Sequence, residues 1–390
     1  MPNPSQALAV RPTAVADTTV RVMVVDDSAV IRGLISRLLQ EDPGIRVVTT
    51  ASNGEQAINT LRRSSVDVIV LDIEMPVMDG LTALPRLLKV DPDVKIIIAS
   101  TLSTRNAEIS IRCLNAGAAD YVPKPTAVRD ISGGVGGGDS FRRELLEKVR
   151  ALGDACVQAR TGDAGERPVR TVAVGPARSD AGPAGTAPFQ LAAPGRKPPA
   201  VLAIGTSTGG PQALFKFLGG LSRNISLPIL IVQHMPATFT SILADHIRKQ
   251  TGLECAEGRD GEAVVPGRIY LAPGDYHMVV EKQGVQRIIR LNQMPPENFC
   301  RPAVDPLFRS LAETYGAPVL GIVLTGLGSD GLKGGEVICR AGGTVVAQDE
   351  ATSVVWGMPG AVARAGLCSA VLPLTDLAPF VEDFVGGRVT

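Results

Sequence analysis

The sequence has no net charge and no long uninterrupted apolar run. Its 390 residues include 39 acidic and 39 basic side chains, so no broad basic field argues for nucleic acid as a partner. No run of eighteen or more apolar residues is free of polar breaks, which argues against a membrane span. Residues 1–19 lack the basic start and apolar core of a signal peptide, and we expect a frayed tail there.

Cysteine and histidine are scarce. The cysteines are scattered without a C-x-x-C pair, a pattern that favours reduced thiols and a cytoplasmic protein over disulfides or zinc. They are Cys113, Cys156, Cys255, Cys300, Cys339 and Cys368. Only three histidines are present. Any reaction that requires an imidazole base therefore has few candidates.

Length and composition indicate two cores joined by a poorly ordered segment. With 45% hydrophobic residues, the 390-residue chain exceeds a single typical domain. Gly133–Gly138 is glycine-rich, Phe141–Leu152 has a short amphipathic helical pattern, and residues 161–198 are rich in Gly, Ala and Pro. We expect a tail over 1–19, one domain over 20–139, a linker with a short helix over 140–197, and a second domain over 198–386.

The strongest chemical signal is Ser207. It follows the apolar run Val201–Thr206 and stands in Gly-Thr-Ser-Thr-Gly-Gly, ahead of a helical pattern that starts at Pro211. This matches the G-x-S-x-G nucleophile elbow, in which a tight turn holds a serine hydroxyl clear of the sheet. Glycine-rich turns of this type also bind phosphate. The absence of a following Gly-Lys-Ser/Thr disfavours a P-loop.

A serine hydroxyl needs a base to take its proton. His234 ends the apolar run Ile229–Gln233, at the strand edge where open α/β sheets place their ligands. His246 falls in a helix predicted over residues 238–250 and is expected on a solvated face. His277 follows a turn and is expected to be a binding or structural residue. His234 is the preferred base.

Asp330 is the candidate orienting carboxylate. It follows the apolar strand pattern that begins at Val319 and a glycine-rich turn, and it precedes another helical pattern. An aspartate there can accept the second ring N–H of His234 and stabilise the imidazolium. The order Ser, His, Asp differs from the order in α/β-hydrolases, so the elbow need not mean that fold.

The same region carries an alternative motif. Gly326-x-Gly328-x-x-Gly331 follows a strand pattern and opens a helix, and Asp349 ends the next apolar run. This arrangement also fits a dinucleotide-binding fingerprint with a ribose-binding acid. We rank it second because it leaves Ser207 and His234 unexplained.

Acidic residues end two strand patterns near the N-terminus. Asp26 and Asp27 follow Val20–Val25, and Asp72 ends Val66–Leu71. Strands alternating with helical patterns imply a parallel sheet, at whose carboxyl edge these acids converge. Three carboxylates together require a cation, and oxygen ligands favour a hard ion such as Mg2+.

Two further strand ends suit phosphoryl transfer. Ser100 ends Val94–Ala99, and Lys124 follows Ala119–Pro123. With the metal, this hydroxyl and this ammonium can stabilise phosphoryl oxygens while Asp72 accepts the phosphoryl group.

Residues 20–125 resemble a response-regulator receiver domain. The resemblance implies a flavodoxin-like fold with a five-stranded parallel sheet and phosphorylation of Asp72 by a chemotaxis-type histidine kinase. It assigns metal binding to Asp26, Asp27, Asp72 and the backbone of Glu74, and switch or phosphate contacts to Ser100, Tyr121 and Lys124.

Residues 198–386 resemble the catalytic domain of the chemotaxis receptor methylesterase family, CheB. Ser207 in Gly-Thr-Ser-Thr-Gly-Gly, His234 in Gln-His-Met-Pro and Asp330 in Gly-Ser-Asp-Gly match that family's triad. Segments Arg301–Phe308 and Val354–Pro359 also read as in the family. The resemblance implies a second doubly wound, largely parallel α/β domain. Where the family commonly has Met, this chain has Leu327, whose N–H serves the oxyanion equally well if only the backbone contributes.

The implied reaction is hydrolysis of glutamate γ-methyl esters on methyl-accepting chemoreceptors, with deamidation of receptor glutamine as a second activity. N–H groups near Thr208 and Leu327 would hold the oxyanion, and the hydrolytic step would need no cofactor. We expect a cytoplasmic monomer whose unphosphorylated receiver covers the Ser207 cleft; phosphorylation that improves substrate docking is the other account. A phosphorylation-controlled adaptor with an inert site is the non-enzymatic alternative.

Overall fold

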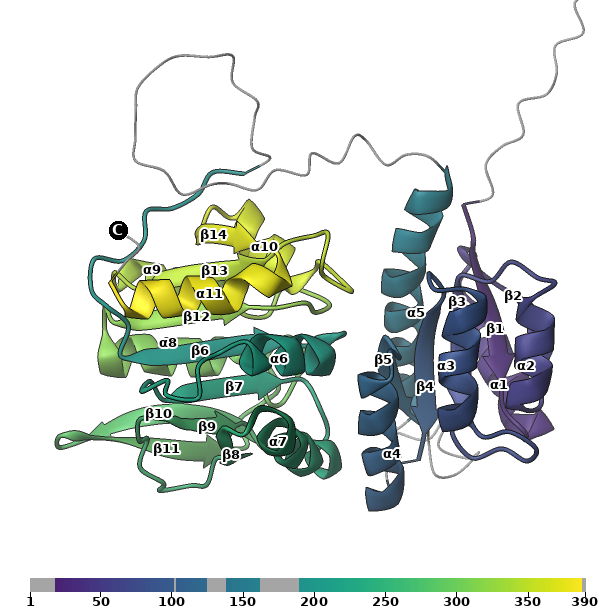
Figure 1. Cartoon of the computed structure of the whole chain (residues 1–390), viewed down its shortest axis with the longest axis horizontal. Coiled ribbons are helices and arrows are strands. Elements are labelled where there is room, and N and C mark those ends of the chain that lie inside the picture. Colours follow the sequence, from purple (N-terminus) through teal and green to yellow (C-terminus); the bar gives the residue numbers. More distant parts are fainter. Residues whose placement is uncertain (1–17, 102, 125–137, 162–188, 388–390) are drawn as a thin grey trace, which may run out of the picture.

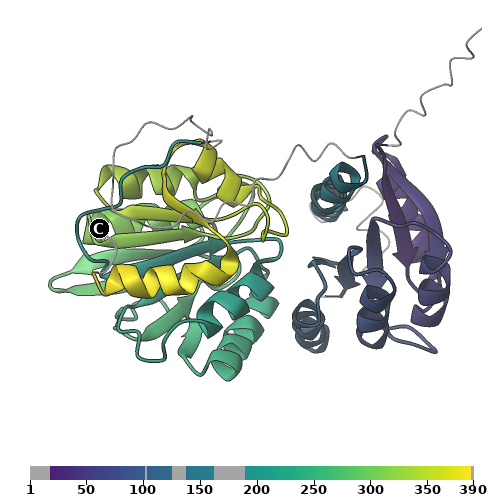
Figure 2. The ribbon, with the colours of Figure 1, turned by 45° about the horizontal axis from the view of Figure 1, so that its top comes forward.

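The computed structural model describes residues 18–101, 103–124, 138–161 and 189–387. They form two α/β units, each built on a parallel sheet (Figures 1 and 2). The predicted tail over 1–19 and the Gly/Ala/Pro-rich segment fall largely outside these residues. None of the described helices is both long and apolar enough to cross a bilayer.

The first unit has a five-stranded sheet in the order β2-β1-β3-β4-β5. Its strands are β1 (Val20–Val25), β2 (Ile45–Ala51), β3 (Val68–Asp72), β4 (Lys95–Ser100) and β5 (Asp120–Pro123). All neighbouring strands pair in parallel. This is the flavodoxin-like order, so the predicted receiver fold is confirmed.

Helices cover both faces of this sheet. They are α1 (Ala29–Gln40), α2 (Gly54–Leu61), α3 (Gly80–Val90), α4 (Thr104–Asn115) and α5 (Gly138–Thr161). Four of them begin at a side-chain cap, because Ser28, Asn53, Asp79 and Ser103 each accept the N–H three residues on. With helices on both faces, strand β3 is buried along its whole length.

The helix expected over 141–152 is twice as long as its sequence pattern indicated. Helix α5 runs from Gly138 to Thr161, and Phe141, Leu145, Val149 and Leu152 are buried against the receiver sheet. In the additional turns Val157 is buried in the same cluster and Arg160 pairs with Asp67, and helices owe most of their stability to such packing. The helix is therefore a layer of the first unit.

The second unit has a seven-stranded sheet in the order β14-β13-β12-β6-β7-β9-β8. Its strands are β6 (Val201–Thr206), β7 (Ile229–Gln233), β8 (Glu254–Glu257), β9 (Arg268–Leu271), β12 (Val319–Val323), β13 (Thr344–Gln348) and β14 (Cys368–Leu372). Every pairing in it is parallel. Strands β10 (His277–Gln283) and β11 (Gln286–Asn292) form a separate antiparallel hairpin.

Two central strands of this sheet create its switch point. From β6 the chain proceeds through β7 towards one edge, whereas β12 leads through β13 to the other. Open α/β sheets bind ligands at such a point, outside the carboxyl ends of the strands. The helices of this unit are α6 (Gly210–Gly219), α7 (Ala237–Thr251), α8 (Val304–Tyr315), α9 (Leu332–Arg340), α10 (Met358–Arg364) and α11 (Leu374–Val385).

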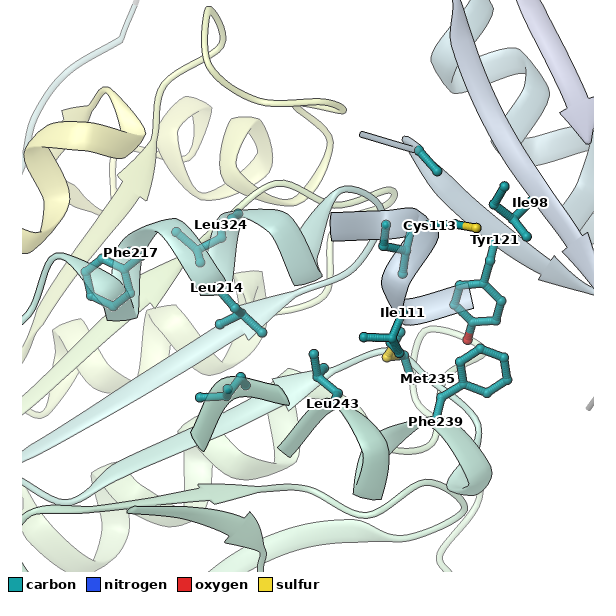
Figure 3. Packing of buried hydrophobic residues seen from close by; sticks show 14 of the residues in the cluster. Ile98, Ile111, Cys113, Tyr121, Leu214, Phe217, Met235, Phe239, Leu243 and Leu324 are labelled. Atoms are coloured by element: carbon teal, nitrogen blue, oxygen red, sulfur yellow. The ribbon is translucent and has the colours of Figure 1, made fainter. Parts of the chain in front are cut away.

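The two units pack against each other through helices. Helix α4 of the receiver contacts α6 and α7 of the second unit, and strand β5 lies beside them (Figure 1). One buried apolar cluster continues across this boundary, from Ile111 and Tyr121 to Met235 and Phe239 (Figure 3).

Candidate active site

Ser207 lies directly after β6, in a turn that requires glycine. Gly209 caps α6 with φ +75°, and a Cβ on it would lie 2.5 Å from the Cβ of Val354. A side chain on Gly210 would collide with Gln233. The turn can therefore close only with glycines after the serine, and it presents Ser207 at the start of a helix.

His234 lies beside Ser207 because their strands are neighbours. Thr206 pairs with Gln233 in the parallel register of β6 and β7, so the next residue of each strand is Ser207 and His234. The His234 N–H donates to Thr206 O over 3.2 Å. Neighbouring strands lie about 4.8 Å apart, which brings the alcohol and the imidazole to the same strand edge.

Asp330 meets His234 from the other side of the switch point. The distance from His234 Nε2 to Asp330 Oδ2 is 2.8 Å, and Asp330 is only 1% exposed. The backbone N–H groups of Val304 and Asp305, at the start of α8, also donate to Asp330. A helix N-terminus favours an anion, so Asp330 is held charged although it is buried.

The charges of His234 and Asp330 stabilise each other. Burial alone would lower the pKa of His234, but the electrostatic interaction with Cys300 and the hydrogen bond to Asp330 outweigh it and raise that pKa to about 10. Burial alone would raise the pKa of Asp330, yet its bonds to His234 and to the α8 backbone lower it. The pair is thus most stable as imidazolium and carboxylate.

Ser207 and His234 are adjacent but not hydrogen-bonded. Within the described residues, no hydrogen bond joins Ser207 Oγ to the imidazole. Asp330 is hydrogen-bonded to Nε2 of His234, so only Nδ1 is left to accept the serine proton. The Cys300 sulfur lies 3.4 Å from this Nδ1 atom. The structure therefore brings His234 and Asp330 into contact, whereas Ser207 is placed near them only by the pairing of its strand with that of His234.

The predicted oxyanion donors lie in two loops that meet at Ser207, its own turn and the loop after β12. Thr208 is buried next to the serine, and Leu327 is half-buried in the loop after β12. Neither backbone N–H donates to another group in the portion of the chain that the structure describes. Two unengaged N–H groups at a nucleophile turn are suited to hold a developing oxyanion.

Three further residues of this site were not predicted. Asn298 donates to both Asp305 and Asp330, whereas Asp305 accepts from the N–H groups of Gly331 and Gly334. Asp330 thus binds the start of α8, and Asp305 in the first turn of α8 binds the start of α9, so the two acids connect the two helices. The acid in the first turn of α8 was a signal for such capping, but Cys300 and Asn298 carried no local signal.

The dinucleotide alternative loses its support in the structure. The glycine loop is filled by the segment after β13, because Gly326 O accepts from the N–H groups of Gly357 and Met358. Asp349, the candidate ribose acid, accepts from the backbone and the hydroxyl of Thr352. Neither group faces an open phosphate cradle.

The other two histidines lie outside the site. His277 is 2% exposed, accepts at Nδ1 from the N–H of Ala303 and donates to Pro295 O, so its role is structural. His246 lies on α7 as expected, but it is half-buried rather than on a solvated face. Glu108 and Arg112 of α4 contribute to its electrostatic surroundings, which places it near the boundary between the units.

The receiver residues also gather at one sheet edge. Oxygen atoms of Asp26, Asp27 and Asp72 lie within 4.8 Å of one another. Lys124 Nζ lies 2.5 Å from Asp26 and 2.7 Å from Asp72. Burial raises the pKa of Asp72, against the opposing effect of Lys124. Three carboxylates and one ammonium leave excess negative charge, which fits a hard divalent cation.

The two switch residues are buried behind this cluster. Ser100 is 1% exposed, and its hydroxyl is 2.9 Å from that of Ser110. Tyr121 is 3% exposed and points towards the second unit, where it meets Phe239 (Figure 3). Glu74 is exposed in the loop after β3 and lines a cavity of about 520 Å³ with Arg105 and Arg112.

A receiver sheet joined to a second doubly wound sheet is the architecture of a response regulator with an enzymatic output domain. A CheB methylesterase family model matches residues 202–381, and a response regulator receiver domain model matches residues 22–134. The chain therefore belongs to the CheB methylesterase family, and it is a carboxylic ester hydrolase.

Similar proteins extend over nearly the whole chain. The protein-glutamate methylesterase/protein-glutamine glutaminase of Azospirillum brasilense is 56% identical over 98% of this chain and 97% of that protein. Protein-glutamate methylesterase/protein-glutamine glutaminase 1 of Paramagnetospirillum magneticum is 53% identical, covering 96% and 98%. The crystal structure of the Thermotoga maritima CheB methylesterase catalytic domain is 38% identical, covers 48% of this chain and 99% of its own, and has a TM-score of 0.47.

Proposed function

We propose that the chain hydrolyses glutamate γ-methyl esters on the cytoplasmic helices of chemoreceptors, for chemotactic adaptation. The observation that carries this proposal is the His234–Asp330 contact of 2.8 Å at the switch point, beside Ser207 on the neighbouring strand. Acyl transfer by a serine requires a histidine that is oriented by a carboxylate and lies next to a serine in a tight strand-to-helix turn. The names of the relatives above give protein glutamate as the target, and the resemblance to the chemotaxis methylesterase family supplies the chemoreceptors.

The reaction proceeds through an acyl-enzyme. Ser207 Oγ attacks the ester carbonyl while His234 takes the serine proton, and the N–H groups of Thr208 and Leu327 stabilise the oxyanion. The carbon–oxygen bond to the methoxy group then breaks, and His234 returns the proton to release methanol. Water repeats the sequence on the acyl-serine, which leaves glutamate and the free enzyme. No cofactor takes part in these steps.

The same residues support glutamine deamidation as a second activity. The attacked carbonyl is then an amide, and the leaving group is ammonia after protonation by His234. Relatives at 56% and 53% identity carry both activities in their names. The common geometry makes one active site sufficient for both reactions.

The receiver supplies the control. We infer that a chemotaxis-type histidine kinase donates a phosphoryl group to Asp72, with Mg2+ held by Asp26, Asp27, Asp72 and the backbone carbonyl of Glu74. The metal would neutralise charge between the carboxylates and the phosphoryl oxygens. Lys124, already 2.7 Å from Asp72, is placed to contact the phosphoryl group.

Contacts between the two units support control by occlusion. The Thr208 hydroxyl donates to Asp120 of β5 over 2.6 Å, and both side chains are buried. A carboxylate of the receiver thus contacts the residue that follows the proposed nucleophile. Its negative charge disfavours the negative charge of an oxyanion held by the Thr208 N–H. Asp120 also pairs with Lys148 of α5 and precedes Tyr121. Movement of Ser100 and Tyr121 on phosphorylation would loosen this contact.

Methyl-labelled receptor fragments provide the direct test. Purified full-length protein should release volatile methanol, and a small phosphodonor with Mg2+ should increase the rate. No methanol under either condition would favour the inert adaptor. Residues 198–390 alone should be more active than the unphosphorylated full chain. Equal or lower activity would instead favour activation through substrate docking. The same preparations should behave as monomers, and the protein should localise to the cytoplasm.

A further inference from the structure

Cys300 contacts the ring nitrogen of His234 that Asp330 leaves open. Its sulfur lies 3.4 Å from Nδ1, whereas Nε2 is engaged by Asp330 at 2.8 Å. An imidazole has only two nitrogens, so both are occupied in this structure. The proposed hydrolysis requires Ser207 to reach one of these two nitrogens. If Ser207 took the place of Asp330 at Nε2, the contact of the ring with a buried acid would be lost.

We propose that Cys300 is a positioning residue for the catalytic base: its sulfur pairs with Nδ1 of His234 in the resting enzyme, and Ser207 must displace it before the ring can take the serine proton. This inference rests on the proposed hydrolysis. It adds that the Cys300 sulfur competes with Ser207 for Nδ1 of His234. While the imidazolium donates from both nitrogens, one to Asp330 and one to Cys300, it carries its proton already and cannot act as a base.

The turn that carries Cys300 is held in place from several sides. Asn298 and Phe299 adopt left-handed backbone conformations, with φ of 51° and 62°. The backbone groups of Glu297 and Cys300 bind each other in both directions, at 2.9 and 3.1 Å. Asn298 donates to Asp330 over 2.9 Å. The backbone that carries Cys300 is therefore held in place relative to the same acid that orients His234.

The receiver side also reaches this turn. Arg143 of α5 lies over the Phe299 ring, with its guanidinium carbon 4.7 Å from the ring centroid. The contact is a cation–π interaction next to Cys300. Since α5 packs on the receiver sheet, movement of the receiver relative to the second unit alters the surroundings of Cys300 together with the Asp120–Thr208 contact.

Several charged groups besides Cys300 set the electrostatics of His234. Asp330 contacts it directly, with Asp305 next to Asp330 and the Arg309–Glu297 ion pair beyond them. Across the domain boundary, Asp120 and Lys148 lie near Thr208. These groups are common to wild type and any Cys300 variant, so a change on replacing Cys300 reports on the sulfur itself.

Histidine NMR in the full-length chain tests the pairing without an activity assay. With only three histidines, the His234 ring signal can be assigned by its loss in His234→Gln. We expect Cys300→Ala to lower the pKa of His234 by about one to three units, because the ring loses its hydrogen-bonding partner at Nδ1. Cys300→Ser, similar in size but lacking an ionisable thiol, should lower it as well. An unchanged pKa in both variants would overturn the proposal.

Kinetics separates this proposal from the proposed function. In the full-length enzyme, the acid limb of the pH profile of kcat/KM on methylated receptor fragments should move to lower pH by the same amount in Cys300→Ala. Cys339→Ala is the matched control, because Cys339 is also half-buried but bonds to Leu367 O. An unmoved acid limb refutes competition at Nδ1 even if hydrolysis is observed. Full activity of the Ser207→Ala variant would instead refute the proposed hydrolytic mechanism itself.

Discussion

Tyr121 of the receiver stacks on Phe239 of α7, with ring centroids 4.4 Å apart and planes inclined by 16°. Both rings are buried, and Lys148 Nζ lies 4.9 Å from the centroid of the tyrosine ring. The aromatic residue expected to respond to phosphorylation thus forms part of the domain boundary itself (Figure 3). Its rotation cannot occur without repacking Phe239, which follows His234 by five residues.

Asp120→Asn should raise the basal esterase activity of the unphosphorylated full chain. The substitution removes a negative charge that lies 2.6 Å from the Thr208 hydroxyl, and a hydrogen bond to a charged group contributes about 1.5–3 kcal/mol. We expect an increase of about tenfold, on the basis that about 1.4 kcal/mol corresponds to a factor of ten. Methanol release without phosphodonor measures it.

Asp42→Asn is the control for this experiment. Asp42 also pairs with a residue of α5, Arg150, but away from the second unit. It should leave the basal rate unchanged. Equal rates for wild type and Asp120→Asn would show that the Asp120–Thr208 contact does not restrain the active site.

Ser207→Ala should reduce turnover by about a millionfold, as removal of the nucleophile does in other triads. The residue is half-buried in a tight turn where alanine fits, so the fold should persist and circular dichroism should be unchanged. Single-turnover methanol release is the measurement. A loss below about tenfold, equivalent to about 1.4 kcal/mol of barrier, would remove Ser207 from its role.

Asp72→Asn should abolish activation by phosphodonor while retaining the basal rate. The amide cannot form an aspartyl phosphate, and it removes one of three carboxylates that lie within 4.8 Å of each other. Rates with and without phosphodonor, at fixed Mg2+, measure this directly. Residual activation in the variant would mean that another group receives the phosphoryl or that the donor acts elsewhere.

The features that could be predicted from the sequence are those marked by apolar strands and by the polar residues at their carboxyl ends. In a parallel sheet with both faces covered, each strand is an apolar run, and its carboxyl end is the place where polar residues converge. The pattern of apolar runs alone therefore singles out Asp26, Asp72 and Ser207. The parallel sheet of the receiver follows from the same pattern, whereas its five strands and the second parallel sheet were implied by the family resemblance, and all are confirmed.

Residues brought in by loops could not be predicted in this way. Cys300 and Asn298 lie in a turn with no apolar period, and left-handed backbone at a non-glycine residue leaves little trace in sequence. The length of α5 was also missed, because its mean hydropathy is low and its stability comes from packing on the receiver sheet. The domain contacts of Asp120 likewise depend on tertiary structure alone.

The stability of the receiver should depend on pH through Asp67. This carboxylate is 5% exposed, and it binds Arg21 of β1 over 2.7 Å and Arg160 of α5 over 2.7 Å. Burial alone would raise its pKa, but the two arginines outweigh it and lower the pKa below 3.8. A depressed folded-state pKa contributes stability above the unfolded value, and this contribution is lost as pH falls through the folded one.

Asp67→Asn should therefore destabilise the receiver by about 2 kcal/mol at pH 7, and by less at about pH 3, below the pKa of the unfolded carboxyl, where part of this contribution is lost. Urea unfolding followed by far-UV circular dichroism at both pH values measures the difference. Asp93→Asn, an exposed acid of the same unit, should show no such change. A destabilisation of equal size at both pH values would mean that Asp67 stabilises the receiver through packing rather than through its charge.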